Sequence, residues 1–175
     1  MMPAVPPAYD IRAACCTISN RARFLTELRR IGEAHATRII CFNADLLAGM
    51  RHAARAAMLA QRAFEAGENI SNTLEMEALL YAAGSRQCTV AAAFGIREGE
   101  NRLYICCLPK REAIWAALES LVRFYGDDGD TIGPEKRDLL MTTFSISPGE
   151  VAAAGGDDRI ADLVLERVAL LQVLR

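Results

Sequence analysis

The sequence lacks an apolar run long enough to cross a membrane. The apolar stretch IADLVLERVALLQVL is interrupted by Asp162, Glu166 and Arg167, whereas a membrane-spanning helix needs about 20 predominantly apolar residues. The N-terminus also lacks the charged, apolar and small-residue order of a secretory signal. We therefore expect a cytoplasmic protein that does not contact a membrane.

The cysteines lack the spacing of a disulfide framework or of a metal site. Two adjacent pairs, Cys15 with Cys16 and Cys106 with Cys107, and two single cysteines lie in apolar surroundings, and no C-x-x-C occurs. Neighbouring residues of a strand point to opposite faces, so an adjacent pair neither bridges internally nor chelates a metal. Buried, reduced thiols are the prediction.

Familiar catalytic signatures are also absent. The chain has no G-x-G-x-x-G, no G-x-x-x-x-G-K-S/T, no G-x-S-x-G and no H-x-x-x-H or H-E-x-x-H. Only His35 and His52 could act as imidazole bases, and the sequence leaves open whether the fold brings a cysteine to one of them. We expect no catalytic residue, no metal and no cofactor.

The charge is unevenly divided along the chain. The net charge is only -2, but residues 1–111 carry 14 Lys and Arg against 10 Asp and Glu, whereas residues 112–175 carry 6 against 12. The first part is therefore +4 and the second -6, which suits an anionic partner for one half and a basic partner for the other.

Hydrophobic periodicity predicts strands and helices mixed within one domain. The expected strands cover residues 10–19, 38–42 and 103–108, and the last is apolar on both faces, as in a central strand covered on both sides. The expected helices cover residues 20–34, 45–65, 72–83, 88–94, 112–124, 134–143 and 157–174, with a short one after Ser147 and a turn at GDDGD. This pattern predicts an α/β (α+β) fold: a single domain over residues 10–175, with a small mixed sheet packed with several helices. A Pro-rich, disordered lead-in of residues 1–9 precedes it.

Two helices and the corner after the second offer polar groups to a ligand. On the helix over 45–65, Arg51, Arg55 and Arg62 fall within about 40° of each other, opposite the apolar stripe and beside His52, which predicts an uncompensated positive face. Asn72, followed by Glu75, is expected to cap the next helix, and Gly84 to end it.

The corner itself carries Ser85, Arg86 and Gln87, where an arginine beside free backbone N–H groups favours an anion. Glu77 lies at the edge of the buried face of the preceding helix, where it forms a structural salt bridge or accepts from Arg86 or from the His52 side.

The C-terminal helix is apolar around most of its girth. Its main stripe consists of Ile160, Leu163, Val164, Val168 and Leu171. Such a helix is either packed deeply in the core or covered by a partner, and both interpretations remain open from the sequence.

Three segments together resemble a known family. FNADLLAGMRHAARAA, ISNTLEMEALLYAAGSRQCTVAAAFGI, and LLMTTFSI with LVLERVALLQ resemble the TPRKB family, the kinase-binding subunit of the KEOPS complex, which makes threonylcarbamoyladenosine in tRNA. The resemblance spans nearly all of residues 10–175 and is greatest to archaeal members.

The resemblance implies a non-catalytic regulatory subunit. Such a subunit binds and stimulates the small atypical kinase/ATPase of KEOPS, and it holds the unpaired CCA acceptor end of tRNA for the other KEOPS subunits. The implied tRNA-binding residues are Arg51, His52, Arg55, Asn72, Glu77, Arg86 and Gln87. The implied kinase-binding residues are Leu163, Val164, Arg167, Val168 and Leu171.

The chemistry of the corner suits a single-stranded RNA end. Recognition of unpaired bases needs side chains that stack on them and hydrogen-bond their edges, and Arg86, Gln87 and Asn72 carry suitable groups. Two other functions fit less of the sequence: a small cytosolic enzyme that binds an anionic metabolite near Arg86 and Glu77, and a structural protein that self-associates through its C-terminal helix.

Overall fold

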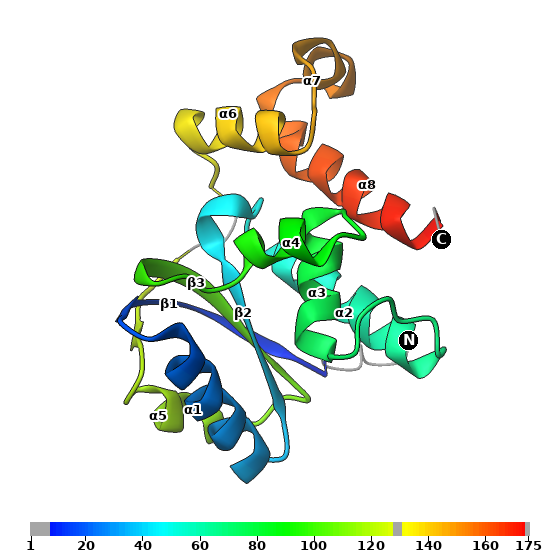
Figure 1. Cartoon of the computed structure of the whole chain (residues 1–175). Helices are drawn as coiled ribbons and strands as arrows, with labels where there is room; N and C mark the ends of the chain where they lie inside the picture. The colour runs from blue at the N-terminus through cyan, green and yellow to red at the C-terminus, as the bar shows by residue number, and fades with distance from the viewer. Residues whose placement is uncertain (1–7, 128–130, 174–175) are drawn as a thin grey trace, which may run out of the picture.

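The computed structural model describes residues 8–127 and 131–173. Figure 1 shows a sheet with helices on both faces and a helical arm formed by α6, α7 and α8. The strands are β1 (Asp10–Ile18), β2 (Arg38–Asn43), β3 (Gly99–Leu108) and β4 (Arg123–Phe124), in the order β2-β3-β1-β4. All three strand pairings of the described chain are antiparallel. The predicted α/β class is confirmed, but the expectation of a mixed sheet is wrong.

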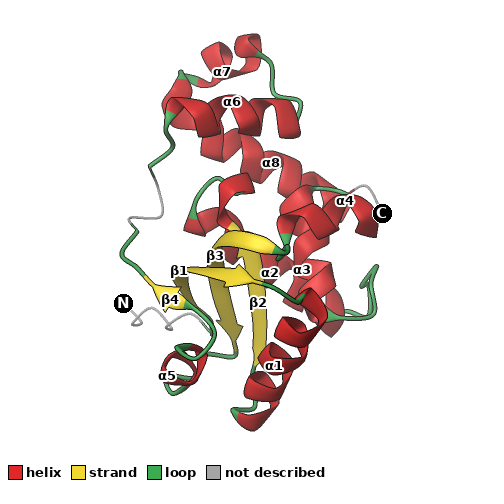
Figure 2. Cartoon of the chain, turned by 60° about the vertical axis from the view of Figure 1, so that its left-hand side comes forward, coloured by secondary structure: helices red, strands yellow, loops and turns green. Residues whose placement is uncertain are grey.

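The strand β3 is central and covered on both faces, as its apolar residues predict. Figure 2 shows the helices on the two sides of the sheet. One face carries α1 (Arg21–Ala34) and α5 (Ile114–Leu118), and the other carries α2 (Met50–Glu65) and α3 (Leu74–Ala83). Leu103 and Ile105 pack toward α1, whereas Tyr104 and Cys106 pack toward α2. The alternation of side chains along one strand thus builds two cores.

Several helices begin where their capping residues predict. The Asn20 side chain accepts a hydrogen bond of 2.9 Å from the Arg23 amide and starts α1. In the arm, α6 (Pro134–Thr143) matches its predicted range, and α7 (Pro148–Ala154) begins with a capping box between Ser147 and Glu150. Such helix ends can be predicted from the local sequence, because the capping residue lies within four residues of the backbone groups that it satisfies.

The long helix α2 begins at Met50 rather than at residue 45. The Asn43 side chain accepts from the Asp45 amide at 3.1 Å and holds a separate 3-10 turn, η1 (Ala44–Leu46). Gly49 then adopts φ 91°, a value that side chains disfavour and that separates the turn from the helix.

The helix expected over residues 112–124 is also shorter than predicted. Its last residues, Arg123 and Phe124, instead form β4 and pair with Cys15 and Ala14 of β1. The Phe124 ring contacts the Trp115 ring edge-on, and their centroids are 5.6 Å apart. Pairing with a strand 108 residues away overrides the local helical pattern.

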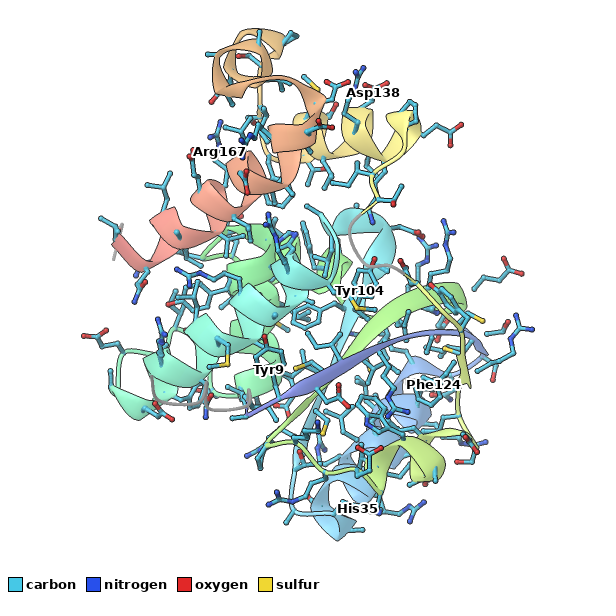
Figure 3. The ribbon with its side chains drawn as sticks, turned by 180° about the vertical axis from the view of Figure 1, so that it is seen from behind. Tyr9, His35, Tyr104, Phe124, Asp138 and Arg167 are labelled. Atoms are coloured by element: carbon cyan, nitrogen blue, oxygen red, sulfur yellow. The ribbon has the colours of Figure 1, made fainter. Side chains whose placement is uncertain are left out.

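The last helix of the arm covers the core on the α2 and α3 side of the sheet, which is called the second core below. After the 3-10 turn η3 (Asp157–Arg159), α8 (Ile160–Val173) packs on α2 and α3. Its apolar stripe is buried there. Core packing is therefore the correct interpretation of this stripe. In Figure 3, Arg167 on α8 and His35 at the end of α1 lie at opposite ends of the molecule.

Three of the expected segments extend beyond the residues that the structure describes. Most of the expected lead-in, most of GDDGD, and Leu174 lie outside the described residues. Ala8 and Tyr9 belong to the fold, contrary to expectation, since the Ala8 carbonyl accepts from the Lys110 amide at 2.7 Å and Tyr9 packs on the core. Within 8–127 and 131–173, no helix has the length and apolar character needed to span a bilayer.

All six cysteines are free, and they differ in burial. Burial raises the pKa of Cys41 to about 12 and that of the half-buried Cys16 to about 11, so both remain thiols at neutral pH. The prediction of buried thiols is wrong for Cys88, which is exposed on the first turn after the corner.

Candidate functional site

The corner between α3 and the short helix α4 (Cys88–Ala91) exposes Arg86 and Gln87. Gly84 ends α3 with φ 60°, and the Ser85 amide donates back to the Leu80 carbonyl at 3.1 Å. The Ser85 hydroxyl oxygen then accepts from the Gln87 amide at 3.1 Å. The left-handed glycine reverses the chain, so the two polar side chains emerge together on the surface.

This α3–α4 corner lies directly against α8. A Cβ atom on Gly84 would stand 3.3 Å from the carbonyl oxygen of Arg167, a tight contact at a position whose φ of 60° already disfavours side chains. The Arg167 guanidinium is itself held by Glu150 at 2.6 Å and by the carbonyls of Phe144 and Ser145 at 3.4 Å. The corner, α8 and the connection from α6 to α7 therefore form one packed unit.

His52 is buried beneath this unit rather than exposed beside the arginines. Its Nδ1 accepts from the Ala48 amide at 3.0 Å, so Nε2 carries the proton and donates to the Ala82 carbonyl at 2.8 Å. Burial lowers its pKa to about 4, which keeps the ring neutral. The expectation that His52 lies on an RNA-facing surface is wrong, because the ring is fully buried and both of its nitrogens bond to backbone groups.

Glu77 is also fully buried, contrary to the expected position at an edge. Its carboxylate accepts from the Ile70 amide at 3.0 and 3.1 Å and from the Ser71 amide at 2.8 Å. It thereby fixes the loop that leads into α3. A base or metabolite could reach this carboxylate only by displacing the loop.

Asn72 is exposed, but it does not cap α3. Thr73 is the cap, and its hydroxyl oxygen accepts from the Met76 amide at 3.2 Å. Glu75, the expected partner of an Asn72 cap, instead pairs with Arg38 at 3.4 Å. Because α3 is about 15 Å long, Asn72 and the corner stand at opposite ends of this helix.

The three arginines of α2 are exposed, as predicted, but only two of them are uncompensated. Arg51 pairs with Asp162 of α8 at 2.9 Å, and Arg159 pairs with the same carboxylate at 3.3 Å. The hydrogen bond from Arg51 is the main reason that the pKa of Asp162 is lowered. Arg55 and Arg62 make no ion pair with any described residue.

The residues expected to bind a kinase are mostly core residues. Leu163, Val164, Val168 and Leu171 are buried against α2 and α3, and Arg167 is engaged as described above. The exposed apolar side chains nearby are Leu170, Val173 and, on α4, Val90. The sequence contained one signal for this second set: Leu170 lies outside the main stripe of the helix.

Several grooves of the described chain lie away from the corner, and none was expected from the sequence. One, of about 920 Å³, lies over β1 and β4, where Arg102 pairs with Asp45 at 2.9 Å and Arg123 donates to the Cys15 sulfur at 3.4 Å. A second, of about 600 Å³, lies between α1 and α3. In the part of the chain that the structure describes, no group of three His, Cys, Asp or Glu side chains could hold a metal ion.

Comparisons with known proteins do not assign a family. A scan against protein-family models finds no match to this chain, and a search of the curated proteins finds none either.

Proposed function

We propose that this chain is a non-catalytic adaptor of the KEOPS type, which holds the single-stranded acceptor end of tRNA and docks and stimulates a kinase/ATPase partner in the cytoplasm. The observation that carries the proposal is the contact of Gly84 with the Arg167 backbone. It joins a polar, exposed corner directly to a helix whose outer side exposes apolar residues. An adaptor needs two such surfaces on one rigid unit.

On the RNA side, the corner supplies the groups that unpaired bases require. Gln87 offers a donor and an acceptor to a base edge, and the planar Arg86 can stack or contact a phosphate. Arg55 and Arg62 offer further positive charge to the phosphates of the RNA. His52 supports this surface from below, because it holds the last turn of α3, whereas Glu77 holds the loop at the other end of that helix.

On the protein side, the outer face of α8 replaces the buried stripe as the kinase-docking surface. Val173 is 76% exposed and Leu170 is 46% exposed. Neighbouring apolar side chains at such exposure favour burial by a partner. Leu163, Val164, Val168 and Leu171 act indirectly, because they hold α8 in place.

The enzyme alternative is less well supported by the geometry. An enzyme would need Glu77 or a cysteine for turnover, and the Glu77 carboxylate is buried and accepts three hydrogen bonds from loop amides. A general acid or base must reach the proton that it transfers.

The test compares binding of the purified protein to labelled full-length tRNA and to the same tRNA without its terminal CCA, across a salt series. We expect affinity to fall when CCA is removed, with a shallow salt dependence because few phosphates are contacted. Arg86→Ala should weaken binding to the full tRNA by about 1–3 kcal/mol. Arg23→Ala, an exposed arginine of α1, is the matched control and should bind as the parent does. Equal binding of both tRNAs would sink the acceptor-end proposal.

A further inference from the structure

The edge of the sheet formed by β2 lies between two helices, and its residues after Arg38 are buried. In the described part of the chain, β2 is one of the two outer strands and pairs with β3 alone, as Figure 2 shows on the side of α1 and α3. Near its end, Asn43 donates to the Ala93 carbonyl at 3.3 Å, so η2 (Ala92–Phe94) covers that part. Along residues 38–41, the outer backbone edge has no backbone partner in the described chain. Unpaired main-chain groups on a sheet edge are a template for another strand.

The groove of about 600 Å³ meets this edge at Arg38 and Ile39, the two residues of β2 that line it. From one face of the sheet α1 contributes Leu25 and Leu28, and from the other α3 contributes Met76 and Leu79. Leu25 and Met76 are only half-buried, although each packs on one of the two cores. The groove therefore has two apolar walls, which meet at Arg38 and Ile39 of β2.

We infer that this groove binds an extended, acidic and apolar peptide segment of a partner protein, which adds to the sheet as a fifth strand beside β2. Successive side chains of such a strand point to opposite faces, so alternate residues would contact Leu25 and Leu28 or Met76 and Leu79. Residues 38–41 span about 13 Å, which sets the paired segment at about four to six residues. Main-chain hydrogen bonds supply affinity in this mode, and the side-chain walls supply selectivity.

Charge on the rim favours acidic residues in the peptide. Arg21 and Arg29 make no ion pair with a described residue, and Arg38 shares its charge with Glu75 across the groove. Together with Glu33, these side chains give the groove a net charge of +1, from three arginines and two glutamates. The attraction between the rim arginines and acidic residues beside the apolar run of the peptide contributes more to selectivity than to affinity.

The shape of the groove favours a single strand over a second copy of the chain. A second copy that presented its own β2 would bring its own α1 and α3 to the same edge. The walls formed by α1 and α3 already stand on both faces there. One extended segment fits between these walls, whereas two sets of helices would compete for the same space.

The experiment begins with a display library of random eight-residue peptides selected on the purified full chain. We expect enrichment of short apolar runs flanked by Asp or Glu. The most enriched peptide is then synthesised in two forms, one unmodified and one N-methylated at alternate residues. The unmodified form should slow amide hydrogen exchange within residues 38–41, and at least one N-methylated register should lose binding, because methylation removes the ladder donors.

Charge reversal on α1 provides a matched pair of variants. Arg29→Glu, on the rim, should weaken the peptide about fivefold, whereas Arg23→Glu, an exposed arginine of the same helix outside the groove, should leave affinity unchanged. Arg86→Ala should also leave it unchanged, which separates this surface from the proposed RNA corner.

Three results would overturn the inference. The first is a selection with no enrichment, or peptides whose binding is indifferent to both Arg29→Glu and N-methylation. The second is protection of residues 38–41 that rises with protein concentration in the absence of peptide, which would assign the edge to self-pairing. The third is an oligonucleotide ending in CCA that protects the same amides and displaces the peptide, which would make the groove an RNA site.

Discussion

The Nε2 atom of His52 lies 2.8 Å from the carbonyl oxygen of Ala82 and joins the first turn of α2 to the last turn of α3. The same ring contacts the Phe144 ring edge-on, where the arm meets the second core, and the two ring centroids are 5.6 Å apart. A single neutral imidazole thus connects three segments beneath the α3–α4 corner.

This burial predicts acid sensitivity. The folded pKa of His52, about 4, lies below the value of about 6.5 in an unfolded chain. Above pH 6.5 neither state binds the proton and stability is complete. As the pH falls toward 4, the unfolded state binds a proton that the folded state refuses, so about 3 kcal/mol should be lost. Urea unfolding followed by circular dichroism at pH 7 and pH 5 should show about 2 kcal/mol of this loss, because pH 5 lies above the folded pKa of about 4.

His52→Gln is the control for the acid effect. Its amide can still donate to Ala82 but does not titrate, so its stability should depend less on pH between 7 and 5 than that of the parent. Equal pH dependence in the two proteins would assign the acid loss to other groups.

Glu77→Gln should destabilise the fold and loosen the loop before α3. The neutral amide accepts more weakly from the Ile70 and Ser71 amides, and we expect a loss of about 2–3 kcal/mol. Urea unfolding gives the loss, and faster amide exchange at the two loop residues locates it. Glu65→Gln, at an exposed position of α2, should change stability by less than about 0.5 kcal/mol. A Glu77→Gln protein as stable as this control would contradict the anchoring role.

Adjacent substitutions distinguish the cap of α3 from the residue before it. Thr73→Ala should cost about 1 kcal/mol, because the Met76 amide loses its acceptor. Asn72→Ala should change the free energy of unfolding by less than about 0.5 kcal/mol. Thermal or urea unfolding of the two variants measures both losses in unfolding free energy. A larger loss for Asn72→Ala than for Thr73→Ala would restore Asn72 as the cap.

Neighbouring leucines of α8 should respond in opposite ways to a charge. Leu171→Glu places a carboxylate in the core and should cost about 3 kcal/mol or more, with loss of the folded far-ultraviolet spectrum on mild heating. Leu170→Glu should leave stability nearly unchanged but reduce binding of the KEOPS kinase/ATPase, measured by calorimetry. Full kinase binding by a folded Leu170→Glu protein would remove the outer face of α8 from the proposal.

The elements that local chemistry specifies were predicted well. Asn20 caps α1, Gly84 ends α3, and Ser147 opens α7, because each signal lies within a few residues of the backbone groups that it satisfies. The apolar stripe of α8 was also visible, although the sequence left open what covers it.

The elements that depend on distant partners were not predicted. Phe124 leaves a helical pattern to pair with β1, and Glu77 and His52 turn inward to satisfy amides and a carbonyl of neighbouring segments. A helical wheel gives the angle of a side chain, but it does not show which face another element will cover. The open edge of β2 and its groove could not be predicted either, since strand order is a property of the whole sheet.

By itself, the sequence determined the mixed helix and strand content, most helix ends and the exposed corner at Arg86 and Gln87, because periodicity and capping act over a few residues. Only the tertiary structure decided that His52, Glu77 and Leu171 are buried while Leu170 is exposed. Burial depends on which segments meet in space, and residues far apart in the chain must be brought together before that is known.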